Sequence, residues 1–322
     1  KMSKSSLLLP AGETIRKDST NWGYPGYLVQ SEFDVYEKLE DELKKRNDDE
    51  LNETVYRSFG EFEDRHYALC RWLRARKFIL NDTITMIEEA TEMRRVPKRL
   101  DFFPTACDAL GCRKSVYLKQ YPQVCVGHCK SGHPVYFSKP GELCVNGLEC
   151  VTTIQGVLNY HWHDMIHNFG GMLKKTACSK DGYKRFEFVC IIDLSGLTPA
   201  KLNKRALNIV KVQSQIDSLC FPETLNRMIV VNAPGFFSVT WRLIKGWIDA
   251  RTANKVEIYS SRKKWEKRLL ELIERDNLPS DYGGDFASTD QIMQQDLGVV
   301  TKGCFREVVQ MLAVRGTAHI DI

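Results

Sequence analysis

The run Phe-Glu-Phe-Val-Cys-Ile-Ile at 186–192 constrains the fold more than any other segment, because it is apolar throughout except for one glutamate. A strand that is covered on both faces of a sheet requires such a run. Two further strands are predicted at 228–232 and 256–259, and helical patterns occupy 150–168, 200–217, 236–248 and 262–274. Strands that alternate with helices predict an α/β fold with a mostly parallel sheet and right-handed crossover helices.

The segments before this region predict a hairpin and a small set of helices. The runs at 124–128 and 133–137 flank Lys-Ser-Gly, which is typical of a turn between two strands. Residues 33–53 place apolar residues at helical spacing within a dense charge mix, and Asn-Asp-Asp at 47–49 ends that helix. Helical patterns follow at 62–77 and 81–95, the second with Asn81 or Asp82 as its N-cap.

Composition describes a globular chain that meets membranes only at their surface. Of the 322 residues 43% are apolar and 27% are charged. The net charge of +5 is too small to indicate nucleic-acid binding, but it permits approach to an anionic membrane. No apolar run approaches the ~18 residues of a membrane span, and Leu-Leu-Leu at 7–9 is too short for a signal peptide. Eleven cysteines without framework spacing indicate reduced thiols and a cytosolic location.

A search for catalytic and metal-binding motifs predicts neither kind of site. The glycine-rich phosphate loops and the nucleophile elbow are absent from the sequence. Cys107 and Arg113 have the spacing of a phosphatase loop, but no glycine-rich cradle lies between them. His163 and His167 are one helical turn apart and could share a metal, yet further ligands are not evident. We therefore expect no catalytic residue, no metal and no cofactor.

A basic run at 69–78 combines an apolar stripe with several cations. Its apolar members fall largely on one helical face, and cations fill much of the rest: Leu69, Trp72, Leu73, Ala75 and Phe78 against Arg71, Arg74, Arg76 and Lys77. Such a helix can bury its stripe and still offer cations to a negatively charged group. Alone, the pattern is more typical of a solvated face over a core.

Short motifs that recur in order give this run a family context. They are Tyr-Pro-Gln at 121–123, Gly-His-Pro-Val-Tyr-Phe at 132–137, Ile-Ile-Asp-Leu-Ser-Gly at 191–196, Phe-Pro-Glu at 221–223, Val-Val-Asn-Ala-Pro-Gly-Phe-Phe-Ser at 230–238, Thr-Ala-Asn-Lys-Val at 252–256, and Asn-Leu-Pro with Tyr-Gly-Gly-Asp at 277–285. In this order and spacing, residues 61–286 resemble the CRAL-TRIO lipid-binding family, in particular its yeast secretory phosphatidylinositol/phosphatidylcholine transfer branch.

The resemblance implies a division of the chain into four parts. Residues 1–30 form an N-terminal arm that is flexible or draped over the fold, and 31–110 form an N-terminal helical unit. Residues 111–286 form the lipid-binding domain, whose sheet and crossover helices enclose an apolar cavity. Residues 287–322 form a C-terminal extension, in which Phe305, Val308, Val309 and Leu312 suggest one more amphipathic helix.

The resemblance also implies a phosphatidylinositol headgroup site at Arg76, Glu223, Thr252 and Lys255, where all four residue types match the family. Arg and Lys suit a phosphodiester, and a carboxylate accepts hydrogen bonds from inositol hydroxyls. A helix beginning near Thr252 would add free backbone N–H groups for an anion. Taken singly, each residue is better explained as a surface ion-pairing residue, and the match of all four favours headgroup binding.

The second ligand of the yeast branch is not implied in the same way. Its phosphatidylcholine site uses a serine and a threonine on one strand, and here those positions are Phe188 and Cys190. Neither side chain has a hydroxyl, so we expect weak phosphatidylcholine binding. A sterol, a prenyl-type lipid or no second ligand is equally compatible.

Residues 238–248 are predicted to form a gate helix, which we call the gate segment. Leu243 lies on one apolar arc with the candidate membrane contacts Trp241, Ile244, Trp247 and Ile248, and Arg242 and Lys245 lie on the other side. Two tryptophans with basic flanks suit a helix that rests in a headgroup interface. A simple core-covering helix is the alternative.

The predicted function is non-catalytic extraction and exchange of phosphatidylinositol, in support of phosphoinositide signalling and membrane trafficking. The expected partners are phosphatidylinositol and a membrane surface, with a phosphatidylinositol kinase as a further candidate and no nucleic acid. We expect a cytoplasmic monomer that associates transiently with membranes. The alternatives are a carrier of another hydrophobic ligand, such as a sterol or prenyl lipid, a scaffold or lipid-sensing module, and, as a distant third, a phosphatase.

Overall fold

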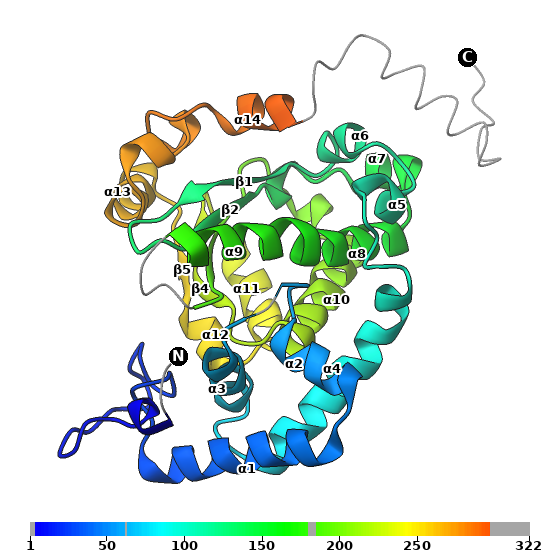
Figure 1. The fold of residues 1–322 in the computed structure, drawn as a ribbon. Coiled ribbons are helices and arrows are strands. Elements are labelled where there is room, and N and C mark those ends of the chain that lie inside the picture. Colours follow the sequence, from blue (N-terminus) through cyan, green and yellow to red (C-terminus); the bar gives the residue numbers. More distant parts are fainter. Residues whose placement is uncertain (1–3, 62, 180–184, 297–322) are drawn as a thin grey trace, which may run out of the picture. The chain divides into compact units, whose positions relative to one another are not determined.

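A computed structural model describes residues 4–61, 63–179 and 185–296 of the chain. The chain divides into two units, which we describe separately (Figure 1). The helical unit comprises residues 1–100, 166–186 and 215–224, and the sheet unit comprises the remaining segments 101–165, 187–214 and 225–322.

The sheet unit is built on five strands in sequential order. They are β1 (Gln123–His128), β2 (Pro134–Ser138), β3 (Phe188–Asp193), β4 (Leu225–Val231) and β5 (Val256–Ile258). β1 pairs with β2 in antiparallel fashion, and β2 to β5 are parallel, which confirms the mostly parallel sheet. When parallel strands follow one another in sequence order, right-handed crossovers bring all their connecting helices to one face of the sheet. The opposite face is left for elements outside the crossovers.

Helix α13 (Arg262–Leu272) covers that opposite face, which we call the α13 face. Side chains at alternate positions of β1 to β4 form its core, and each of them is at most 7% exposed. Trp265 and Leu269 of α13 pack on these strands together with Ile273, Leu278 and Tyr282. The α13 face is therefore a closed core.

The other face of the sheet packs against helix α11 (Phe237–Lys245), and we call it the α11 face. Phe237, Trp241 and Ile244 of α11 lie against β3 and β4 there. Four side chains of this face, in the middle of the sheet, are only half-buried: Tyr136, Phe188, Ile192 and Met228. The two faces of one sheet thus differ, because only the α11 face keeps apolar side chains partly uncovered.

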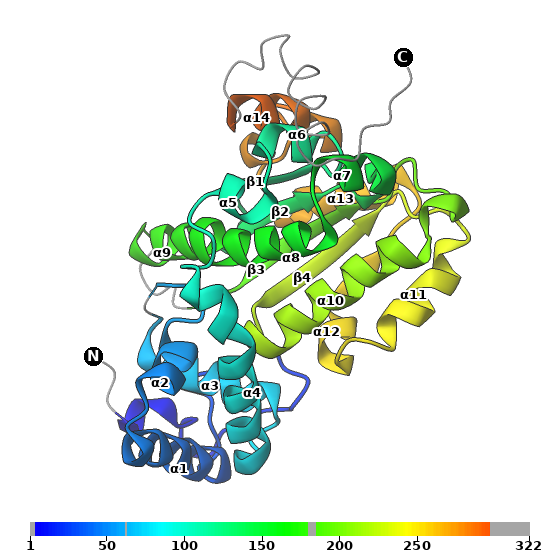
Figure 2. The ribbon, with the colours of Figure 1, turned by 90° about the vertical axis from the view of Figure 1, so that its right-hand side faces the viewer.

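The remaining helices of the sheet unit are short or connect its strands (Figure 2). They are α5 (Ala106–Leu110), α6 (Lys114–Leu118), α7 (Val145–Val151), α8 (Ile154–His163), α12 (Ala250–Asn254) and α14 (Thr289–Asp296). A π-helical segment, Asp164–Phe169, extends α8 into α9 (Gly170–Ser179), so the helix predicted at 150–168 is longer than expected. Helix α10 (Lys204–Cys220) has residues in both units. The helix suggested by Phe305 to Leu312 lies outside the described residues.

The helical unit contains α1 (Gln30–Arg46), α2 (Asp49–Tyr56), α3 (Arg65–Ala75) and α4 (Leu80–Arg99). Asn47 ends α1 in a left-handed conformation, as the Asn-Asp-Asp segment indicated. Asp48 caps α2, a helix that the sequence pattern did not predict. The predicted cap of α4 was wrong, because its N-cap is Ile79 and Asp82 lies inside the first turn. An acidic residue in that turn favours the helix through the macrodipole.

The basic run forms α3 as predicted, but two of its arginines are not on a solvated face. Arg71 and Arg74 are each 2% exposed. The Arg71 guanidinium donates to Glu63 (Nη2–Oε2 2.7 Å) and to Ser58 Oγ (2.9 Å). A buried cation is tolerated only when it is paired and hydrogen-bonded. These arginines are therefore part of the core of the helical unit.

The N-terminal arm is draped over the helical unit in the described residues. Leu7 and Leu28 are fully buried, and Leu7 O accepts backbone hydrogen bonds from Leu28 N (3.2 Å) and Gly26 N (2.8 Å). Trp22 and Tyr24 are 3% and 7% exposed. Of the two alternatives that the sequence left open, a flexible arm and a draped one, the structure shows the draped arm for these segments.

Substituting Glu257 is expected to destabilise the chain more at neutral pH than in acid. Burial alone would raise the pKa of Glu257, but hydrogen bonds from Arg268, Tyr259 and Arg227 outweigh burial and lower the pKa to about 2 from 4.5. A depressed carboxylate pKa stabilises the fold above 4.5, and this contribution disappears as the pH falls toward the folded-state value. Glu257→Gln should reduce the urea unfolding free energy by about 1–2 kcal/mol at pH 7. An equal reduction at pH 3 would contradict this assignment.

Candidate functional site

Glu223 is held in the helical unit by the two buried arginines of α3. Arg71 Nη1 donates to Pro222 O at 3.0 Å, and Arg74 Nε lies 3.7 Å from Glu223 Oε2. The side chain of Glu223 is only 10% exposed. Its backbone is left-handed, with φ of 58°, a conformation that costs a non-glycine residue roughly 1–2 kcal/mol. The contacts to α3 therefore fix an unfavourable backbone that presents this carboxylate.

Arg76, the second predicted headgroup residue of this unit, follows the last residue of α3. It is half-buried, and its Nη1 donates to the neighbouring carbonyl of Ala75 at 3.2 Å. Within the described residues its guanidinium makes no ion pair, so its charge is not neutralised there. Lys77 and Phe78, which follow, are both left-handed, with φ of 52° and 60°. In the helical unit, Glu223 itself and the two residues that follow Arg76 therefore have strained backbone conformations.

Thr252 and Lys255 lie in the sheet unit at the end of α12. The Lys255 amide donates to Thr252 O (3.0 Å), and its ammonium donates to Leu225 O (2.7 Å), which fixes the side chain beside the start of β4. A helix does begin close to Thr252: Asp249 is the N-cap of α12, Thr252 lies in the first turn, and Lys255 is the residue after the last one. A cation is favoured at that end of a helix, and Lys255 supplies it.

Phe188 and Cys190 share the α11 face, as strand alternation requires. Cys190 is paired across the sheet with Tyr136 and with Met228. Burial raises the pKa of Tyr136 well above its usual range, and Asp164 and Tyr121 add to the rise. Tyr136 and Tyr121 therefore bring phenol hydroxyls close to this part of the α11 face.

Sequence reasoning did not single out these phenols as site residues. Tyr121 OH and Ser138 Oγ are 3.2 Å apart, next to the row of Tyr136 and Cys190. Both tyrosines stand inside the quoted motifs, and the alternation of β2 would have placed Tyr136 opposite Cys190. Hydroxyls from β2 and from the segment before β1 therefore lie near Cys190, although Phe188 and Cys190 themselves carry none.

The gate segment forms a shorter helix than predicted. Helix α11 ends at Lys245, so Trp247 and Ile248 lie in the turn beyond it and are half-buried. Trp241 and Ile244 pack on the α11 face, as a helix that covers the core should. Leu243 does not share their arc, because it is 49% exposed, and Val239 one turn earlier is 67% exposed. The outward apolar pair of α11 is therefore Val239 and Leu243, flanked by the exposed Arg242 and Lys245.

The rival catalytic and metal-binding candidates do not form such sites. Cys107 lies inside α5, where the capping box of Thr105 and Asp108 makes the segment helical instead of a phosphate-binding loop. His163 is buried with Nδ1 2.6 Å from Phe103 O, whereas His167 is exposed. Among the residues described, no group of three or more His, Cys, Asp or Glu side chains could hold a metal. None of the described helices is long and apolar enough to cross a bilayer.

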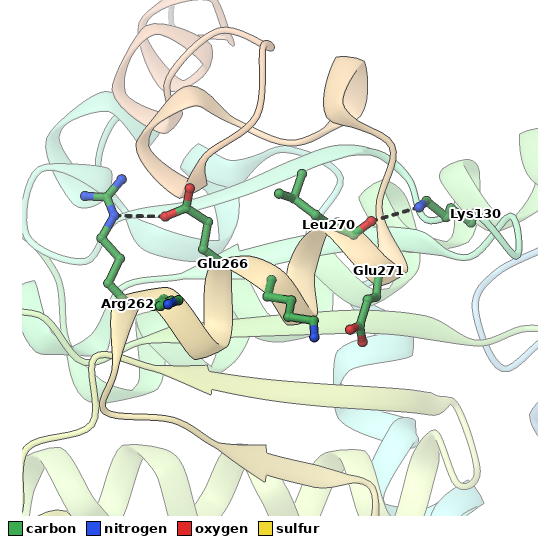
Figure 3. A pocket seen from close by; sticks show the side chains of 7 residues that line it. Lys130, Arg262, Glu266, Leu270 and Glu271 are labelled. Atoms are coloured by element: carbon green, nitrogen blue, oxygen red, sulfur yellow. Dashed lines mark hydrogen bonds and ion pairs between the residues drawn. The ribbon is translucent and has the colours of Figure 1, made fainter.

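A hollow of about 850 Å³ lies on the surface of α13 (Figure 3). Its lining consists mainly of charged side chains: Lys130, Arg262, Lys263, Glu266, Lys267, Leu270 and Glu271. Lys130 Nζ donates to Leu270 O (2.8 Å), and Arg262 pairs with Glu266 (3.1 Å). The hollow is on the surface of the helix that covers the α13 face, so it does not open onto the half-buried side chains of the α11 face.

Comparisons with known proteins agree with the fold and with the motifs. Residues 118–284, just over half of the chain, match the CRAL/TRIO domain. The chain is 31% identical over 247 residues to the phosphatidylinositol/phosphatidylcholine transfer protein SFH12 of Arabidopsis thaliana, covering 74% of this chain and 43% of that protein. It is 31% identical over 220 residues to the SEC14 cytosolic factor of Candida glabrata, covering 67% and 70%. The chain belongs to the CRAL/TRIO domain family.

A solved structure shows the same fold. The crystal structure of Sfh5 superposes with a TM-score of 0.59 over 89% of this chain and 99% of that chain, at 15% identity. The α/β fold expected from the resemblance is confirmed. The chain spans less than half the length of the Arabidopsis relatives named SFH12, SFH9 and SFH4.

Proposed function

We propose that this protein extracts phosphatidylinositol from a membrane, shields its acyl chains and releases or presents it elsewhere. The difference between the two faces of the sheet supports lipid binding most directly. The α13 face is closed, whereas Tyr136, Phe188, Ile192 and Met228 of the α11 face keep partly uncovered apolar surface. Burying acyl chains against these side chains is favourable by ~0.8 kcal/mol per CH₂ group. The α11 face could therefore compete with a bilayer for the lipid.

The choice of phosphatidylinositol rests on the four headgroup candidates. Arg76 and Lys255 would bind the phosphodiester through charge-assisted hydrogen bonds, and Glu223 would accept from inositol hydroxyls. Thr252 would add one hydroxyl. The names of the similar plant proteins include phosphatidylinositol, which agrees with this proposal.

The work we propose is binding and exchange without covalent chemistry, a catalytic residue or a cofactor. The protein would act as a cytoplasmic monomer that touches membranes transiently, and it could hand its lipid to a phosphatidylinositol kinase. A carrier of a sterol or prenyl lipid is the second candidate. The bulk that Phe188 adds to the α11 face favours it, since this side chain replaces a small hydroxyl residue of the resembling family.

Phosphatidylinositol is expected to be transferred between liposomes at least tenfold faster than phosphatidylcholine. Phe188 and Cys190 offer no hydroxyl, and the loss of hydrogen bonds to a charged group costs ~1.5–3 kcal/mol. The measurement is transfer of each labelled lipid from donor to acceptor vesicles of one composition. Equal rates would show that the Tyr121, Tyr136 and Ser138 hydroxyls compensate. The absence of phosphatidylinositol transfer would contradict the proposed function.

A further inference from the structure

The hollow on the outer side of α13 has a cation at each end. The Lys130 amide donates to Leu272 O and its ammonium donates to Leu270 O, both at 2.8 Å, so the turn between β1 and β2 is tied to the end of the helix. Arg262, the first residue of α13, lies at the other end of the hollow (Figure 3). From Arg262 to Leu270 the helix rises about 12 Å, which sets the length of the hollow.

Two lysines between these ends are exposed, and neither makes an ion pair within the described part of the chain. They are Lys263 and Lys267, and because they are four residues apart on one helix, their like charges repel each other. The first turn of α13 also contains Arg262 and Lys264 and no acidic residue, although the macrodipole disfavours cations there. These cations therefore weaken the helix that carries them, and the packing of Trp265 on the sheet opposes this effect.

The side chains in the hollow favour an acidic peptide over other anions. Glu266 and Glu271 stand among the cations, and Leu270 adds an apolar side chain. A nucleic-acid backbone carries negative charge along its whole length, so it would meet both carboxylates. A single phosphate needs donors that converge on one point, whereas these cations are spread along the helix. A peptide can alternate acidic with apolar side chains, and four extended residues span about 13 Å.

The hollow lies on the opposite side of the sheet from the apolar pair of α11. Helix α13 covers one face of the sheet and α11 covers the other. A flat bilayer in contact with Val239 and Leu243 of α11 therefore does not reach the hollow. The occupant that fits this placement is a segment of another protein, which can bind while α11 rests on a membrane.

We propose that the hollow on α13 is a docking site for a short acidic, partly apolar segment of a partner protein. The acidic side chains of the segment pair with Lys263 and Lys267, and an apolar side chain contacts Leu270. The proposal goes beyond lipid transfer, because the hollow shares no residue with the headgroup candidates or with α11. Its consequence is that a partner can be held beside the protein while lipid is exchanged on the other side of the sheet.

The test is the binding of a fluorescein-labelled ten-residue peptide, with Glu at alternate positions and Leu or Ser between them, to the full chain. Fluorescence anisotropy measures the affinity. Lys263→Glu combined with Lys267→Glu should weaken binding about tenfold, and Lys263→Gln combined with Lys267→Gln about threefold. The Gln variant should melt at the same temperature as the wild type or higher, since it removes a like-charge pair.

The matched control reverses two exposed cations of α10 in the same unit, Lys204 and Lys211. This variant changes the net charge equally and should bind the peptide as the wild type does. A second control is the same peptide with Gln in place of Glu, which should bind at least tenfold more weakly. Equal binding by the α10 and α13 reversals would show that the peptide responds only to net charge, and it would overturn the proposal.

The titration is then repeated with the protein bound to anionic liposomes, where the peptide affinity should be unchanged. Displacement of the peptide by liposomes would mean that α13 itself contacts lipid, and it would overturn the proposal. The same holds if the wild-type chain does not bind the peptide, or if an oligonucleotide of equal charge binds more tightly through Lys263 and Lys267. The titration in solution contains no lipid, so its failure is distinguishable from a failure of phosphatidylinositol transfer, which would refute the proposed function.

Discussion

Arg76→Ala and Lys255→Ala should each lower phosphatidylinositol transfer at least tenfold while the fold stays intact. Each removes a cation that we assign to the phosphodiester, and each lost charge-assisted hydrogen bond costs ~1.5–3 kcal/mol. The fold should tolerate Arg76→Ala, because within the described residues this guanidinium bonds only to the adjacent carbonyl of Ala75. Lys255→Ala loses in addition the contact to Leu225 O, so a small loss of stability is expected there.

The matched control is Lys264→Ala on α13. Lys264 is an exposed cation on the helix that covers the other face of the sheet, and its removal changes the net charge equally. Transfer by this variant should be unchanged. If both headgroup variants retain wild-type transfer, with the fold confirmed by circular dichroism, the headgroup assignment is wrong.

Val239→Glu combined with Leu243→Glu should slow lipid exchange about tenfold or more without lowering the unfolding free energy. The two side chains are 67% and 49% exposed, so the closed protein loses little when they change. If α11 rests in a headgroup interface, the same charges have to enter that interface, which is unfavourable. Liposomes should also shift tryptophan emission to the blue, and the double variant should remove part of that shift.

Trp241→Glu provides the contrast. Because Trp241 packs on the α11 face, its substitution should lower both exchange and stability. Anionic lipid should accelerate exchange through Arg242 and Lys245, and salt should weaken this effect because surface charges are screened beyond ~10 Å at 0.1 M. Reversal of both charges should abolish the acceleration, whereas reversal of Lys263 and Lys267 on α13 should not. Unchanged exchange in the Val239 and Leu243 double variant would mean that lipid enters elsewhere.

The strands could be predicted from the sequence because burial dictates their pattern. The run at 186–192 corresponds to β3, and the alternation of β2 and β4 places Tyr136 and Met228 on the same face as Cys190. These features depend on local period and on the handedness of crossovers, both of which are general. The ends of helices were less predictable, because tertiary contacts and capping residues determine where α11 and α12 end.

The buried arginines could not be predicted from the basic run. Amphipathic patterns place charged residues outside, but Arg71 bonds to Glu63 and to the carbonyl of Pro222, which lies 151 positions away in the sequence. The same holds for Tyr24, whose partners Arg74 and Arg185 are distant along the chain. Such pairings depend on which segments the fold brings together, and no local spacing encodes them. The left-handed backbone of Glu223 depends on these contacts, so it could not be predicted from the sequence either.

The most direct test of the account is the lipid that the purified protein carries. Native mass spectrometry of the full chain, followed by extraction and identification of the bound lipid, reports the ligand without an assumption about the assay. We predict one phospholipid per chain, with phosphatidylinositol strongly enriched over its share of the host membrane and depleted in the Arg76→Ala and Lys255→Ala variants. A bound sterol or prenyl lipid, or a protein that carries no lipid and takes up no phosphatidylinositol from liposomes, would contradict the account.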